Sequence, residues 1–254
     1  MFYSACLNAL FGHLSPAEAV KTARDCGLSA FEIWGWWDMD LDALLKAKEE
    51  HGLYMTAMCT RMISLTDAGQ RNAYLDGLQQ SIAEAQKLGC TMLISQVGGE
   101  LSHLTREEQH QSIVDGLKAC VPLLEQAGMM LVIEPLNTLI DHPGYYLTRS
   151  DEAFAIVREV DSPHIKVLYD VYHQQITEGN LIPTIQQNID WIGHIHIAGH
   201  PGRHEVLGNQ EIHYPAVLSA LAKAGYTGAI GLEYFPVEDA CAGLQKLLKE
   251  IPLI

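Results

Sequence analysis

A recurring unit, a helical pattern followed by a short apolar run, limits the possible folds of this chain more than any other feature. Several units have a glycine between the two parts, as in EHGLYMTAMC, KLGCTMLISQ and QAGMMLVIEP. Glycine is the usual residue at a helix C-terminus because it adopts the left-handed conformation at little cost. The apolar runs are continuous rather than alternating, which is typical of parallel strands buried on both faces. The pattern therefore predicts strands and helices in alternation.

Eight strands are predicted in this way, and helical patterns separate nearly all of them. Their ranges are 2–8, 30–34, 54–59, 91–96, 130–135, 165–170, 192–197 and 229–234. Strict alternation requires a parallel sheet, and eight units in 254 residues match the closed (β/α)8 or TIM barrel. We therefore predict one α/β domain over residues 1–254. A doubly wound open sheet is the alternative, but it usually has a glycine-rich phosphate turn after its first strand, and CLNALFGH is no such turn.

The charge balance bears on possible partners. Lys and Arg number 16 against 31 Asp and Glu, which gives a formal net charge of −15. A surface this acidic repels phosphate groups, so we expect neither nucleic acid nor an anionic membrane as a partner. The first residues lack the pattern of a signal peptide, and no stretch approaches the ~18 apolar residues of a membrane span. The expected location is the cytoplasm.

The cysteines give no sign of a disulfide framework. Six of them stand singly, without a CxxC pair. In a chain of this length such cysteines are mostly small buried hydrophobic residues. We therefore expect reduced cysteines, as in a reducing compartment; they are Cys6, Cys26, Cys59, Cys90, Cys120 and Cys241.

Polar side chains end four consecutive predicted strands. Glu134 ends the fifth strand, Asp170 the sixth and Glu233 the eighth, while His194 and His196 lie near the end of the seventh. Side chains at the carboxyl ends of the strands of such a barrel meet on its active-site face. These four strands therefore bring carboxylates and an imidazole to one rim.

Three carboxylates in one pocket repel one another, and at least one takes up a proton unless a cation lies among them. Three carboxylates and an imidazole suit a divalent ion such as Mn²⁺, Mg²⁺ or Co²⁺. A single carboxylate at a strand end is more often a helix cap or an ion-pair partner, and a single histidine in an apolar strand is more often a core residue. We interpret His194 as such a core residue. The coincidence of Glu134, Asp170, His196 and Glu233 on adjacent strands predicts the metal site.

Further polar and aromatic residues follow these strands. His173 lies three residues after Asp170, where we expect a strand-to-helix loop, and Arg203 follows the seventh strand. Arg203 is a fixed cation that can hold a substrate oxygen or a carboxylate. Trp34, Trp36 and Trp37 follow the second strand, either as an apolar wall of the site or as part of an oligomer interface.

These motifs resemble the hydroxypyruvate isomerase group of the xylose-isomerase-like TIM barrels, which are related to the ketose 3-epimerases. The likeness covers essentially the whole chain. It is strongest in LVIEPLN, YDVYHQQITEG, IGHIHIAGHPGRHE and GLEYFP, and SACLNALFGH is similar to the first strand and loop of that family.

The resemblance implies a role for each candidate residue. Glu134, Asp170, His196 and Glu233 would bind one divalent metal ion, and Glu134 and Glu233 would be the catalytic pair that transfers the proton. His173 and Arg203 would contact substrate oxygens. Members of this family commonly form homodimers or homotetramers. Two departures are visible: no Pro-Gly-Thr-Gly stretch follows Arg203, and His196 stands where some hydroxypyruvate isomerases have Gln, which favours the epimerases.

The expected activity is a metal-dependent isomerisation of a small hydroxycarbonyl compound, a sugar or a keto acid such as hydroxypyruvate, by proton transfer through an enediolate. If the proton returns to the original carbon from the opposite face, the same residues act as a ketose 3-epimerase. Two other readings have less support. A non-catalytic sugar-binding barrel does not need a complete set of ligands, and an apurinic endonuclease-like phosphodiesterase needs a more His-rich metal cluster and a cationic rim.

Overall fold

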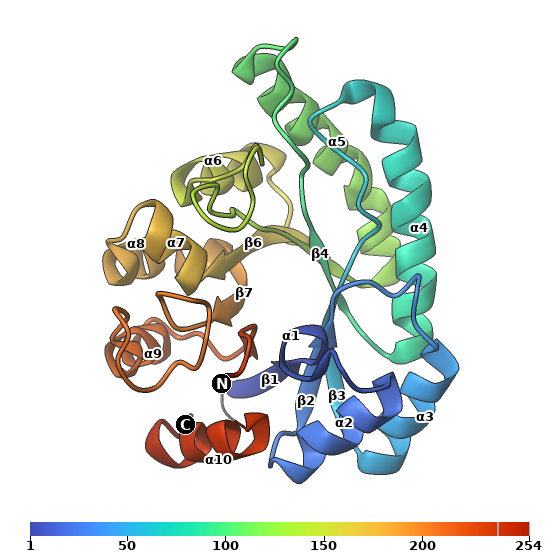
Figure 1. Cartoon of the computed structure of the whole chain (residues 1–254). Helices are drawn as coiled ribbons and strands as arrows, with labels where there is room; N and C mark the ends of the chain where they lie inside the picture. The colour runs from blue at the N-terminus through green and yellow to red at the C-terminus, as the bar shows by residue number, and fades with distance from the viewer. Residues whose placement is uncertain (238, 254) are drawn as a thin grey trace.

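In the computed structural model, parallel strands pair in chain order and the last strand pairs with the first, which closes a barrel of eight strands (Figure 1). The structure describes residues 1–237 and 239–253, so residues 238 and 254 of the predicted range 1–254 lie outside it. The strands are β1 (Phe2–Cys6), β2 (Ala30–Ile33), β3 (Tyr54–Cys59), β4 (Met92–Ser95), β5 (Met130–Ile133), β6 (Ile165–Asp170), β7 (Ile192–Ile197) and β8 (Ala229–Leu232).

Helices connect the strands and surround the barrel (Figure 1). They are α1 (Leu7–Phe11), α2 (Pro16–Asp25), α3 (Leu41–His51), α4 (Arg71–Leu88), α5 (Arg106–Ala127), α6 (Ser150–Val160), α7 (Val171–Thr177), α8 (Leu181–Asn188), α9 (Tyr214–Lys223) and α10 (Ala240–Glu250), with the short 3₁₀ helices Ala68–Gln70 and Ile189–Trp191. Within residues 1–237 and 239–253, no helix has the length and apolar character needed to cross a membrane.

The sequence prediction of the barrel is confirmed, and each predicted strand range contains an observed strand. The observed strands are shorter at several ends, because ladder pairing stops where the chain turns toward the next helix. Gly89 ends α4 with φ +67° and Gly128 ends α5 with φ +66°, the left-handed conformation predicted for glycine between helix and strand.

Apolar side chains fill two regions of the barrel. The larger cluster packs the helices against the strands, and the smaller one consists of Ala57, Cys59, Ile94, Val132 and Leu168 from the adjacent strands β3 to β6. Ala57 and Cys59 are two residues apart, so their side chains lie on the same face of β3. Because Cys59 also lines the cavity described below, the smaller cluster supports the floor of that cavity.

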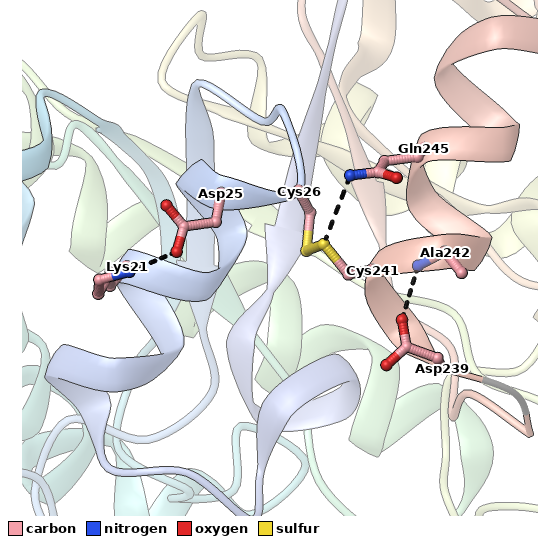
Figure 2. Close-up of a disulfide and its surroundings, with 7 residues drawn as sticks. All are labelled: Lys21, Asp25, Cys26, Asp239, Cys241, Ala242 and Gln245. Carbon is pink, nitrogen blue, oxygen red and sulfur yellow. Dashed lines mark hydrogen bonds and ion pairs between the residues drawn. A yellow bond between two sulfur atoms is a disulfide. The ribbon is translucent and has the colours of Figure 1, made fainter.

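One cysteine pair departs from the sequence prediction. Cys26, which follows the last turn of α2, forms a disulfide with Cys241 in the first turn of α10 (Figure 2). The two Cα atoms are 4.9 Å apart although 215 residues separate them in sequence, so no local spacing could reveal the pair. The prediction of reduced cysteines is therefore wrong for this pair. It is confirmed for the free, buried residues Cys6, Cys59, Cys90 and Cys120.

Reduction of this disulfide should destabilise the barrel, because the bond joins the first large helix to the last. We expect dithiothreitol to lower the free energy of unfolding by about 2–4 kcal/mol, a typical contribution of one disulfide. Thermal unfolding with and without reductant measures the effect. The variant Cys241→Ser should unfold at the same temperature in both conditions. Equal unfolding of the unaltered protein in both conditions would contradict the prediction.

Candidate metal centre and active site

The four predicted ligands lie together at the carboxyl end of the barrel. Glu134 directly follows β5, Asp170 is the last residue of β6, His196 lies in β7 and Glu233 directly follows β8. Because the strands are parallel and neighbours in the barrel, their ends meet at one rim, as predicted. All four side chains are buried.

The ligand atoms of these residues surround one point. Each residue offers a nitrogen or an oxygen, and the four atoms lie within 4.8 Å of one another. Nδ1 of His196 is 3.6 Å from Oε1 of Glu134 and 3.4 Å from Oε2 of Glu233. This is the spacing of groups that can share one cation.

Buried atoms without hydrogen-bond partners also indicate a metal site. Oε1 of Glu134, Oδ2 of Asp170 and Nδ1 of His196 are buried and have no hydrogen-bond partner among the described residues. Leaving a buried polar atom unpaired is unfavourable, so such atoms at one point call for an explanation. The donors are oxygens with one nitrogen, which suits a divalent ion such as Mn²⁺, Mg²⁺ or Co²⁺. The residues therefore fit a bound metal ion.

The pKa values of the three carboxyl groups also favour a cation among them. Burial raises the pKa of Glu134 to about 7, with a contribution from the Glu233 and Asp170 carboxylates, while contact with His196 opposes the rise. Burial likewise raises the pKa of Asp170, although the charge of Arg203 opposes it. For Glu233 the effect of burial is outweighed by the charges of Arg203 and His196, so its pKa lies far below the usual range. The cluster thus holds a proton near neutral pH unless a further cation lets all three carboxylates ionise.

Asp170 serves both as a helix cap and as a candidate ligand. Its Oδ1 accepts hydrogen bonds from the backbone N–H groups of Tyr172, at 2.7 Å, and His173, at 3.2 Å, which caps the N-terminus of α7. Its Oδ2 remains for the cluster. Asp170 is therefore a helix cap, and its second carboxylate oxygen stays available as a candidate metal ligand.

His173 lies at the site, but in a helix rather than in the predicted loop. Because Asp170 caps the chain directly after β6, α7 begins without a connecting loop. The His173 ring is fully buried, and its Nδ1 is 2.6 Å from Nδ2 of Asn137. Its Nε2 lies 3.6 Å from Oδ2 of Asp170 and has no hydrogen-bond partner among the described residues. His173 therefore presents one nitrogen to the site.

Arg203 lies in the loop after β7, as predicted, and it is more deeply buried than a residue on an open rim. Its guanidinium bonds to the Glu233 carboxylate and lies 3.9 Å from Oδ2 of Asp170. It also lies over the ring of Tyr172, 5.3 Å from the centroid. The structure therefore shows Arg203 holding a carboxylate of the protein itself, which keeps Glu233 ionised.

Of the three neighbouring tryptophans, Trp34 lies at the site, whereas Trp36 and Trp37 contact other parts of the protein. Trp34 Nε1 donates a hydrogen bond of 2.5 Å to Oε1 of Glu233, and the Trp34 ring packs edge-on against Phe235. Trp36 donates to Ser81 instead. The guanidinium of Arg61 lies over both Trp36 and Trp37. Only Trp34 therefore forms part of the site, which supports the prediction of an apolar wall for this residue alone.

A cavity of about 210 Å³ opens above the cluster. It is lined by Trp34, Cys59, Met62, Gln96, Glu134, Leu136, His142, His173, Arg203 and Glu233. Cys59 ends β3 and Gln96 follows β4, so the same rule of strand ends could have identified both from the sequence. His142 follows no strand directly, and no pattern marks it.

The histidine assigned to the core is confirmed as such, and it has a partner that the sequence analysis missed. His194 is fully buried, and its Nε2 is 2.9 Å from Oε2 of Glu32 in β2. Glu32 also approaches His196. An acidic residue within the apolar segment AFEIW was a visible anomaly that could have drawn attention to Glu32.

Comparisons with known proteins agree with the barrel fold. The family model for the xylose isomerase-like TIM barrel matches residues 20–251. A hydroxypyruvate isomerase from Escherichia coli is 31% identical, over 96% of this chain and 96% of that protein. A 2-oxo-tetronate isomerase from Cupriavidus necator is 45% identical over 46% of this chain and 44% of that protein. The crystal structure of an AP endonuclease, family 2, from Brucella melitensis superposes with a TM-score of 0.93 at 26% identity, covering 98% of this chain and 99% of that one.

Proposed function

This chain is an isomerase of the xylose isomerase-like TIM-barrel family, and we propose that it interconverts a small 2-keto acid and its isomer, as in the conversion of hydroxypyruvate to tartronate semialdehyde. The observation that carries the proposal is the convergence of Glu134, Asp170, His196 and Glu233 on one point beneath a cavity. A site of this composition suits proton transfer next to a carbonyl group.

The four converging side chains would hold one divalent ion, for which Mn²⁺, Mg²⁺ and Co²⁺ are the candidates. When bound, the ion would stabilise negative charge on the carbonyl oxygen and the neighbouring hydroxyl oxygen of the substrate. The cavity volume of about 210 Å³ suits a compound of a few carbon atoms. Trp34, Met62 and Leu136 supply apolar surface to its wall.

Glu134 and Glu233 would carry the proton. One glutamate removes the proton from the carbon that bears the hydroxyl, which gives an enediolate. The same or the facing glutamate returns a proton to the neighbouring carbon, while the hydroxyl proton passes to the former carbonyl oxygen. Before an ion binds, their environments differ, since burial raises the pKa of Glu134 to about 7 and Arg203 keeps Glu233 ionised. A pair of carboxyl groups with different proton affinities suits a proton shuttle. His173 and Arg203 would contact the substrate oxygens.

Epimerisation remains the alternative outcome of the same chemistry. If the proton returns to the original carbon from the opposite face, the enzyme is a ketose 3-epimerase, and the same four residues would bind the metal ion. Cleavage of nucleic acid has less support, because a formal net charge of −15 opposes the approach of a polyanion. A non-catalytic sugar-binding barrel would leave the paired glutamates without a role.

Proton NMR in D₂O tests the proposal directly. We expect the protein with Mn²⁺ or Mg²⁺ to exchange the carbon-bound proton of hydroxypyruvate or another small hydroxy-keto acid for deuterium and to form the isomeric aldehyde. A panel of small ketoses in the same experiment detects epimerisation by the appearance of the epimer. Binding of a compound without any exchange of its carbon-bound proton would contradict an isomerase and favour the non-catalytic barrel.

A further inference from the structure

Glu32 contacts the imidazole of His196 through the ring nitrogen that the site does not use. Nε2 of His196 lies 2.9 Å from Oε1 of Glu32, and neither atom has a hydrogen-bond partner elsewhere among the described residues, whereas Nδ1 faces Glu134 and Glu233. Glu32 comes from β2, far along the barrel wall from β7. It is fully buried and contributes no atom to the cluster of four ligands.

We propose that Glu32 is a positioning residue, which holds the His196 ring so that the Nδ1 lone pair is aimed at the metal site. The inference rests on the proposed function, because it presupposes that an ion binds there. A proton on Nε2, facing the Glu32 carboxylate, leaves Nδ1 free to act as a ligand. Metal-binding histidines almost always donate their other N–H to a carboxylate, a carbonyl or a water molecule, and the Glu32 carboxylate is the group next to Nε2 of His196.

The surroundings of Glu32 fix its carboxylate in this position. Oε2 accepts a hydrogen bond of 2.9 Å from Nε2 of His194 and one of 3.2 Å from Oγ1 of Thr56. Oγ1 of Thr56 is in turn 2.6 Å from Oγ of Ser4. One carboxylate oxygen is thus held by the scaffold, and the other is left for His196. A side chain bound in this way can orient a ring with little freedom of its own.

Gly231 provides an independent observation. It pairs with His196 in the register of β7 and β8. A Cβ atom at this position would lie 2.4 Å from Oε1 of Glu32 and 2.5 Å from Cδ2 of His196. No side chain fits there without moving one of them. The strand therefore leaves room for the contact between Glu32 and His196, which is expected if the contact has a role.

The test uses the full chain, and its readout is the binding of Mn²⁺, measured by calorimetry and by the electron paramagnetic resonance signal of the ion. We expect Glu32→Gln to raise the Kd for Mn²⁺ about 10–100-fold, the usual effect of losing such a partner. The matched control is Tyr3→Phe, which removes a buried hydrogen bond to the carbonyl oxygen of Ile251 without touching the site. It should bind Mn²⁺ as the unaltered protein does.

A double-mutant cycle with His196→Gln separates positioning from a general structural role. Glutamine keeps an oxygen donor that does not depend on the tautomer of a ring. If Glu32 acts through His196, Glu32→Gln should have little further effect in this background. An equal loss in both backgrounds would overturn the inference. If Glu32→Gln does not fold, Glu32→Asp, which shortens the side chain and keeps the charge, is measured in the same cycle.

The outcomes distinguish this inference from the proposed function. Failure of the unaltered protein to bind Mn²⁺ would overturn both. Normal binding of Mn²⁺ by Glu32→Gln would overturn the positioning role alone. Two Mn²⁺ ions per chain, one of which Glu32→Gln loses, would mean that Glu32, His194 and His196 form a second site, which also contradicts the positioning role.

Discussion

Replacing Glu134 with Gln should lower kcat by about 10²–10⁴-fold, the usual contribution of a general acid–base group. Glutamine has nearly the same shape but can neither take up nor release the substrate proton. Deuterium exchange into the substrate in D₂O should fall by a similar factor, because it reports the proton transfer itself. Both quantities are measured with saturating Mn²⁺, so that a weaker affinity for the ion does not account for the loss.

The matched control carries the same substitution on the surface. Glu159 lies near the end of α6, half exposed, with His110 as its neighbour. Glu159→Gln should therefore keep the kcat of the unaltered protein. A Glu134→Gln variant that kept more than about a tenth of the kcat would fall outside the range for a general acid–base group and would assign proton transfer to another residue.

The fold and the centre of the site were both predictable because they depend on the positions of residues along the strands. Continuous apolar runs separated by helices predict a parallel barrel, and in that architecture the strand ends meet. This rule alone predicts the convergence of Glu134, Asp170, His196 and Glu233, although Glu134 and Glu233 are 99 positions apart in the sequence. The position of a residue at the end of a strand is enough to predict that its side chain lies at this rim, even when its contacts are unknown.

The features that the sequence analysis missed depend on contacts between side chains. Glu32 interacts with His194 and His196 across 162 or more positions in sequence, and no spacing indicates that pairing. The disulfide between Cys26 and Cys241 is likewise a meeting of distant segments. The sequence predicts a loop at His173, whereas α7 already begins before it because the Asp170 side chain caps this helix, a contact that periodicity does not reveal. Periodicity predicts backbone elements, whereas these features require the packed structure.

Removing divalent metal ions should abolish activity and lower the thermal stability of the folded protein. After dialysis against a chelator, we expect kcat to fall below detection and to return when Mn²⁺, Mg²⁺ or Co²⁺ is added. An ion at 100 times its Kd contributes about 2.7 kcal/mol of stability, which for a chain of this size raises Tm by about 5–10 °C. The affinity for the ion should weaken as the pH falls below about 7, because the raised pKa of Glu134 means that a proton then competes for that carboxylate.

Asp170→Asn separates binding of the ion by the cluster from binding elsewhere on this acidic protein. Asparagine is as good a helix cap as aspartate, so α7 should remain folded while the cluster loses one charge. We expect the increase in Tm with Mn²⁺ to shrink by more than half in this variant. Asp40→Asn changes another capping aspartate, at the start of α3 and outside the cluster, and should keep the full increase. Since only Asp170 of these two caps also offers a free carboxylate oxygen to the cluster, an equal increase in both variants would place the ion away from Glu134, His196 and Glu233.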